Sequence, residues 1–235
     1  MLFQNNATGA VAHDAGLAAH MRMIFNYMTG GVALSGLTAW LTMKSPEAMQ
    51  FAVSANLFLF FAWFAAGMFF HWVAFKVQPV AALAFFAAYS VLTGFMLTPL
   101  VLMYTGADIT MAFFAAAGSF LAASLYGYTT GRSLAGLGSF LAVGGIALMI
   151  FAVVLIGMSI FSTVPQGLSL VFSFLVVPFI VMAIAYKMNQ IRDNFHMYGS
   201  DELTSSRMAI VNALGFYTDF VVLFIHILNI IGSRR

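Results

Sequence analysis

The feature that most constrains this sequence is a series of seven apolar stretches, each long enough to cross a lipid bilayer. A bilayer span takes about 20 consecutive residues of mainly apolar character. Short polar or turn-forming segments separate the stretches, for example Lys44-Ser45-Pro46-Glu47 and Thr105-Gly106-Ala107-Asp108. The predicted spans cover residues 23–43, 51–75, 80–104, 109–129, 138–161, 168–188 and 208–231. We therefore predict an all-α membrane protein built as a seven-transmembrane-helix bundle.

Composition excludes a soluble domain. Of the 235 residues, 63% are hydrophobic and 7% are charged, whereas a soluble domain carries roughly 25% charged residues. Too few polar side chains remain to cover a surface that faces water. We expect the lipid bilayer to be the main partner. Residues 1–22 are predicted to be a cytoplasmic tail, residues 23–235 the membrane domain, and residues 189–207 its one long polar loop.

Basic residues suggest an orientation, because Lys and Arg gather on the cytoplasmic side of membrane proteins. With the N-terminus inside, six basic residues lie on or near the cytoplasmic side: Arg22, Lys76, Arg132, Lys187, Arg192 and Arg207. Three fall on the other side: Lys44, Arg234 and Arg235. This count favours a cytoplasmic N-terminus and an external C-terminus.

Several kinds of chemistry lack their residues or motifs. The chain has no cysteine, which removes disulfides, thiolate metal sites and a cysteine nucleophile. It contains no Walker loop, no dinucleotide fingerprint and no His-Glu-x-x-His pair. Its net charge of +2 is small and scattered, which argues against nucleic acid as a partner. We predict no enzymatic activity, no cofactor and no metal site.

The strongest functional candidate is Asp219, in the last predicted span. A charge in mid-membrane costs at least about 2.5–3.5 kcal/mol, so such a residue is a functional candidate by default. Asp219 lies eleven residues into its span, about 16 Å deep at 1.5 Å per residue. Asn212, Asp219 and His226 are spaced by seven and share one helix face. Gly215 on that side is expected to leave room for a partner helix.

Two further residues have alternative interpretations. His226 is predicted mainly as a buried neutral imidazole bonded to a carbonyl, and secondarily as part of an ion pathway. Lys187 ends the sixth predicted span. Its amine either reaches the headgroups by extending along the helix or turns inward to pair with Asp219. A pair would keep the Asp219 carboxylate charged, against the effect of burial.

Small residues indicate where helices meet. Gly127 and Gly131 are four residues apart, a spacing that lets helix backbones approach closely in lipid. The alternative is the ordinary glycine content of membrane helices.

Two segments resemble motifs of the transmembrane Bax inhibitor motif family. Residues 124–132, Ser-Leu-Tyr-Gly-Tyr-Thr-Thr-Gly-Arg, are similar to its S-L-Y-G-Y-T-T-x-R-D-L-S-G. Residues 213–224, Ala-Leu-Gly-Phe-Tyr-Thr-Asp-Phe-Val-Val-Leu-Phe, are similar to its A-L-x-L-Y-L-D-F-I-N-L-F. With the seven-span layout, the resemblance covers nearly the whole chain.

The resemblance implies a bundle in which six helices surround the last one, in a bacterial-type inner membrane. It also implies a pH-sensitive Ca²⁺ leak, gated by two aspartates that share a proton. The seventh-helix aspartate matches Asp219. The sixth-helix aspartate, in a Y-D-x-x-Q pattern, matches Lys187 of Tyr186-Lys187-Met188-Asn189-Gln190. The chain departs from the family there, and also at Ser133 and Val222, where the family often has Asp and Asn.

This departure has a physical consequence. Two close carboxylates share a proton near neutral pH, whereas a carboxylate beside an ammonium stays charged. We expect the acid–base switch to be lost, with Lys187 and Asp219 forming a fixed latch that disfavours Ca²⁺. The alternative is a non-transporting modulator that binds a membrane protease through residues 189–207 and the N-terminal tail. A proton-coupled transporter using Asp219 and His226 is a weaker third hypothesis.

Overall fold

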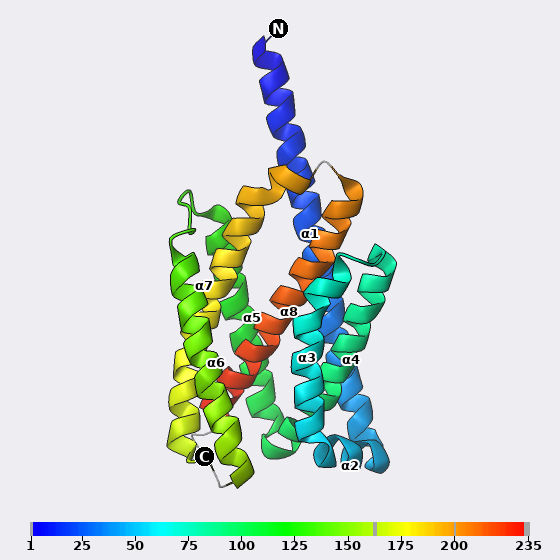
Figure 1. The fold of residues 1–235 in the computed structure, drawn as a ribbon, viewed down its shortest axis with the longest axis vertical. Coiled ribbons are helices and arrows are strands. Elements are labelled where there is room, and N and C mark those ends of the chain that lie inside the picture. Colours follow the sequence, from blue (N-terminus) through cyan, green and yellow to red (C-terminus); the bar gives the residue numbers. More distant parts are fainter. Residues whose placement is uncertain (1, 162–163, 200, 233–235) are drawn as a thin grey trace. The chain divides into compact units, whose positions relative to one another are not determined.

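The computed structural model describes residues 2–161, 164–199 and 201–232 of the chain, and within these ranges the regular secondary structure is entirely helical. Figure 1 shows the helices in chain order. Their bounds are α1 (Leu2–Lys44), α2 (Pro46–Ser54), α3 (Asn56–Ala74), α4 (Pro79–Met103), α5 (Gly106–Thr129), α6 (Leu137–Phe161), α7 (Gln166–Tyr198) and α8 (Glu202–Gly232). The all-α prediction is confirmed.

Length and apolar character identify five described helices that can cross a membrane, namely α4, α5, α6, α7 and α8. The bent pair α2–α3 makes a sixth if it is counted as one span. Helix α1 falls outside this set because its predicted span, residues 23–43, contains several polar side chains: Asn26, Thr29, Ser35, Thr38 and Thr42. The count of seven is thus not reached on length and composition.

The predicted span at residues 51–75 is broken in two. Helices α2 and α3 meet at Ala55 with a bend of 74°. Helix α2 begins before residue 51 because Pro46 suits the first helical turn and the Ser45 hydroxyl accepts a hydrogen bond from the Ala48 amide at 3.3 Å. The prediction of one continuous span was wrong here.

One segment predicted as a loop is largely helical. Helix α7 continues to Tyr198 and α8 begins at Glu202, so most of residues 189–207 lies in these two helices. Residues 189–198 contain neither proline nor glycine, and the helix ends just before Gly199. Residues 2–22, predicted as a cytoplasmic tail, form the first part of α1.

Arg234 and Arg235, which entered the orientation count, lie outside the described residues.

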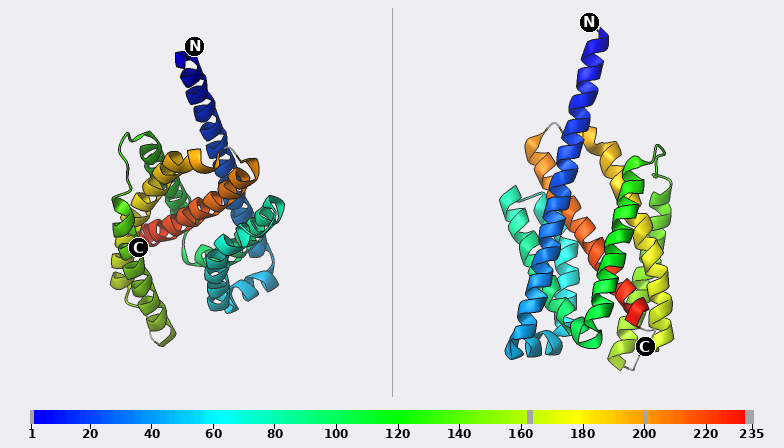
Figure 2. Two further views of the ribbon diagram at one scale, coloured as in Figure 1. Left: turned by 45° about the horizontal axis from the view of Figure 1, so that its top comes forward. Right: turned by 180° about the vertical axis from the view of Figure 1, so that it is seen from behind.

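The chain forms two compact units, each with its own packing. The first comprises residues 1–103 and 194–217. In it, α4 packs against α1, α2 and α3, and Figure 2 shows α1 and α4 running side by side. Gly94 makes this contact possible, because a Cβ there would lie 2.6 Å from the backbone oxygen of Ser35. The Tyr217 hydroxyl is hydrogen-bonded to Ser35 in this core.

The second unit comprises residues 104–193 and 218–235. Helix α5 buries one stripe of small and aromatic side chains, and Phe220 of α8 packs edge-on against Phe113 and Phe120 of α5. Helix α6 buries no residue. Its Gly144 faces α7, since a Cβ there would lie 2.8 Å from the Phe179 ring.

Candidate functional site

The centre of the candidate site is an ion pair between α7 and α8. The Lys187 ammonium donates hydrogen bonds to both carboxylate oxygens of Asp219, at 2.9 Å and 2.8 Å. The Asp219 side chain is 9% exposed and that of Lys187 is 43% exposed. Two positions were considered for the Lys187 amine. In the structure it pairs with Asp219 and does not extend along the helix toward the headgroups.

Both members of the pair lie inside their helices rather than at the ends. Lys187 precedes the end of α7 by eleven residues, about 16 Å of helix. Asp219 lies near the middle of α8. Each charge alone would cost at least about 2.5–3.5 kcal/mol at the centre of a bilayer. Direct pairing offsets much of that penalty, because the two charges neutralise each other and the hydrogen bonds are charge-assisted.

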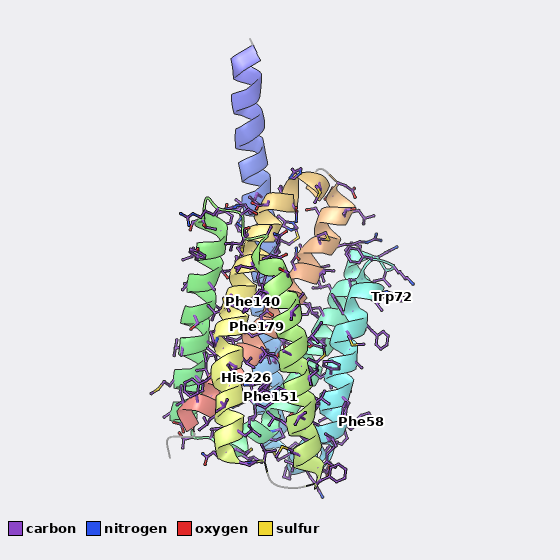
Figure 3. The ribbon with its side chains drawn as sticks, turned by 60° about the vertical axis from the view of Figure 1, so that its left-hand side comes forward. Phe58, Trp72, Phe140, Phe151, Phe179 and His226 are labelled. Atoms are coloured by element: carbon purple, nitrogen blue, oxygen red, sulfur yellow. The ribbon has the colours of Figure 1, made fainter. Side chains whose placement is uncertain are left out.

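His226 belongs to a second polar cluster on the same two helices (Figure 3). Its Nδ1 lies 3.0 Å from the Ser173 hydroxyl, which donates to the Ser169 carbonyl at 3.1 Å. His226 Nδ1 is therefore the donor to Ser173. The Asn229 amide donates to the Ser169 hydroxyl at 2.7 Å. The predicted hydrogen bond of His226 thus exists, but its partner is a hydroxyl and not a carbonyl.

Asn212 does not join the ion pair. It lies two turns before Asp219 on α8, about 10 Å along the axis. Its Nδ2 atom is buried and has no hydrogen-bond partner among the described residues. Gly215 also differs from expectation: no atom of the described chain lies within 4 Å of the place where its Cβ would be. It is therefore not a point of close helix contact.

Two residues of α7 that the sequence analysis missed hold the end of α5. Asn189 is fully buried; its Oδ1 accepts from the Leu134 amide at 2.9 Å, and its Nδ2 donates to the Arg132 carbonyl at 3.2 Å. Arg192 donates to the carbonyls of Tyr128 and Thr130. The last carbonyls of a helix have no partner within it, so Arg192 acts as a C-terminal cap of α5 supplied by another helix, while Asn189 holds the connection that follows.

The same region contains a close approach of the α5 and α7 backbones. A Cβ at Gly127 would overlap the backbone carbonyl of Ala185, whereas a Cβ at Gly131 would meet nothing within 4 Å. Of the two glycines predicted to allow close packing, only Gly127 does so. Residues 124–134 are thus fixed to α7 by backbone contact as well as by Asn189 and Arg192.

Outside the predicted spans, His20 is a buried histidine in the first unit. Its Nδ1 lies 3.1 Å from the Ser205 hydroxyl, and its ring packs against Phe195. Burial lowers the pKa of His20 from 6.5 to about 4. The folded protein therefore keeps this ring neutral at pH 7.

The low pKa of His20 makes stability depend on pH. Between pH 6.5 and pH 4 the unfolded chain binds a proton at His20 that the folded chain does not. This difference in proton binding fades as the pH rises above 6.5. As the pH falls to 5, we expect it to lower the free energy of unfolding by about 2 kcal/mol. The His20→Asn variant should lose less stability than wild type when unfolding in detergent is compared at pH 7.5 and pH 5. An equal loss in both proteins would contradict this assignment.

Among the described residues, no three His, Cys, Asp or Glu side chains come together as a metal site would require. The chemistry that the site can offer is that of one ion pair with a buried carboxylate and a neighbouring set of neutral polar groups on the same helices.

Comparison with known proteins places this geometry in a family. The model of the family described as inhibitor of apoptosis-promoting Bax1 matches residues 17–235. The chain is 31% identical over 224 residues to the uncharacterized protein RP147 of Rickettsia prowazekii, covering 94% of this chain and 92% of that one. It is 30% identical over 225 residues to the inner membrane protein YbhL of Escherichia coli K12, covering 94% of each. The chain thus belongs to the Bax inhibitor family of membrane proteins.

Proposed function

We propose that this protein is an inner-membrane ion leak protein of the Bax inhibitor type, in which the Lys187–Asp219 pair is a latch that pH does not release. The observation that carries the proposal is the pair itself, with both carboxylate oxygens bonded to one ammonium in the middle of α8.

The chemistry of the pair supports a pH-independent latch. Two facing carboxylates cannot both ionise cheaply, so they share a proton and titrate near neutral pH. The Asp219 carboxylate instead faces the Lys187 ammonium at 2.8 Å. A carboxylate and an ammonium attract each other in their charged forms, so they do not share a proton as two carboxylates do. The latch therefore stays closed across the range in which a two-carboxylate gate opens and closes.

The pair also disfavours Ca²⁺ as the permeant ion. Ca²⁺ takes six to eight oxygen ligands at about 2.3–2.6 Å. Here both oxygens of the buried carboxylate are occupied by Lys187. The ammonium adds a like charge that repels a divalent cation. We expect a low Ca²⁺ leak in the wild-type protein.

Several observations support the membrane arrangement that accompanies this function: seven spans, with α1 as the first and α8 inside the bundle. Of the five candidate spans, α8 buries the largest share of its most apolar window, 61% against 39% or less for the others. With Lys187 counted inside the bundle, the remaining basic residues still favour a cytoplasmic N-terminus, by five to three. The relative YbhL is named an inner membrane protein.

Flux measurements on purified protein in liposomes test the function. Wild type should show a low Ca²⁺ flux that is flat from pH 6 to pH 8. Lys187→Asp places a second carboxylate beside Asp219, so its flux should be higher and depend on pH. Lys44→Asp, at the exposed end of α1, changes the net charge equally and should behave as wild type.

Two results would contradict the latch. One is a steep pH response of the wild-type protein that Asp219→Asn abolishes. The other is no flux from wild type and Lys187→Asp alike, together with a membrane protease that co-purifies in detergent. That second outcome would favour the non-transporting modulator.

A further inference from the structure

Helix α2 cannot cross a membrane by itself. It has nine residues, Pro46–Ser54, and spans about 13 Å, less than half of the roughly 30 Å hydrocarbon core. The 74° bend at Ala55 turns it away from the direction of α3. Figure 1 shows α2 lying across the end of α3, next to the point where α1 ends. The segment between α1 and α3 is therefore either in the hydrocarbon as a re-entrant turn or at the membrane surface.

Helix α2 has a buried face and an opposite, exposed face on which a polar stripe lies between exposed Phe51 and Val53. Ala52 is fully buried, and Ala48 and Met49, on the same side, are half-buried. On the opposite side, three polar residues spaced as i, i+3 and i+7 are all exposed: Glu47, Gln50 and Ser54. A stripe containing a carboxylate is costly in hydrocarbon. The buried face covers the end of the first unit, so the polar stripe needs water or lipid headgroups.

Tryptophan–lysine pairs lie at both ends of the first unit. The Lys44 ammonium lies 5.3 Å from the ring centre of Trp40, beside the start of α2, and Trp40 is 54% exposed. The Lys76 ammonium lies 4.2 Å from the ring centre of Trp72, at the far end of α3. Exposed Trp rings with basic neighbours are typical of the membrane–water interface.

The spacing of these pairs fits one crossing by α3. Its 19 residues extend about 28 Å, close to the thickness of the hydrocarbon core. In Figure 3, Phe58 and Trp72 point outward from the two ends of this helix. The exposed side chains between them are apolar, among them Phe61, Phe64 and Met68.

The geometry points to α2 as an interfacial helix whose partner is the phospholipid headgroup layer. Its polar face, Glu47, Gln50 and Ser54, lies in water, while Trp40 and Lys44 lie among the headgroups of the same leaflet. Trp72 and Lys76 lie in the opposite leaflet, and α3 is the whole of the second span. The assignment is independent of ion flux.

Cysteine labelling tests this placement, because the natural chain has no cysteine. Gln50→Cys and Phe64→Cys both replace side chains on the surface of the protein, the second one 43% exposed. The two positions therefore differ in their expected surroundings, which are water at residue 50 and the hydrocarbon core at residue 64. In membranes broken open so that the reagent reaches both sides, Gln50→Cys should react with a membrane-impermeant maleimide as fully as after denaturation in SDS. Phe64→Cys should react at least about tenfold less, since the reaction requires a solvated thiolate.

A sidedness measurement completes the test. Lys44→Cys and Gln50→Cys should be labelled from one side of sealed vesicles, and Lys76→Cys from the other. Protection of Gln50→Cys to the level of Phe64→Cys, with full labelling in SDS, would overturn the proposal in favour of a re-entrant turn. Labelling of Lys44→Cys and Lys76→Cys from the same side would equally overturn it. Neither result would bear on the flux experiment.

Discussion

Replacing Lys187 with methionine is expected to destabilise the folded protein by about 3 kcal/mol, because the Asp219 carboxylate would remain buried without a partner. Methionine keeps most of the length and apolar stem of lysine and removes the ammonium, with its charge and its two hydrogen bonds to Asp219. The Asp219 side chain is 9% exposed, so solvent cannot replace the lost ammonium. Unfolding by SDS titration or by heat in a mild detergent measures the loss directly.

A double variant separates the ion pair from its desolvation penalty. Lys187→Met combined with Asp219→Leu removes both charges, and we expect it to recover most of the lost stability, since apolar residues in place of a buried pair are often neutral or stabilising. Lys44→Met, at an exposed position with one aromatic contact, is the matched control and should change stability by less than about 1 kcal/mol. A Lys187→Met variant as stable as this control would show that the pair is not buried in the membrane protein.

Replacing Gly127 with alanine is expected to destabilise the second unit by about 3 kcal/mol. The new Cβ would overlap the Ala185 carbonyl, which is backbone and cannot rotate away as a side chain would. The helices α5 and α7 would have to separate, with loss of packing along their contact and strain on the hydrogen bonds from Asn189 and Arg192. Thermal unfolding in detergent is the measurement.

Gly118 provides the matched control on the same helix. A Cβ there would meet no atom within 4 Å. Gly118→Ala should therefore leave stability unchanged or raise it by about 0.5–1 kcal/mol, the gain expected from alanine in a helix interior. If Gly127→Ala were as stable as Gly118→Ala, the close contact with Ala185 would not exist in the membrane.

The comparison of sequence and structure shows which features apolar patterning can predict. The apolar stretches that correspond to α4, α5, α6, α7 and α8 were located correctly. A helix pairs all its backbone groups within itself, which a long apolar segment needs in lipid. The break at Ala55 was missed because no proline or glycine lies there. The helical part of residues 189–207 was missed because polar composition was taken as evidence for a loop, although composition decides where a helix leaves the membrane and not where it ends.

The sequence could predict the contact of the site that joins two side chains, but not the contacts between a side chain and the backbone. Asp219 followed from its depth, and Lys187 from its place in a motif, so their pairing was a reasonable alternative before the structure was known. Asn189 and Arg192 were missed because their partners are backbone carbonyls and an amide at 128–134. Every residue carries such groups, so a sequence contains no sign of which ones will lack a partner within their own helix.

The arrangement on α7 links the Lys187–Asp219 pair to the contacts that hold the end of α5. Lys187 bonds α8, while Asn189 and Arg192, within a turn and a half on the same helix, bond the end of α5 and the connection that follows it. Turning this part of α7 enough to withdraw the ammonium would also break the contacts of the other two side chains. Any motion that turns this part of α7 is thus cooperative, because several interactions held by one helix have to break together.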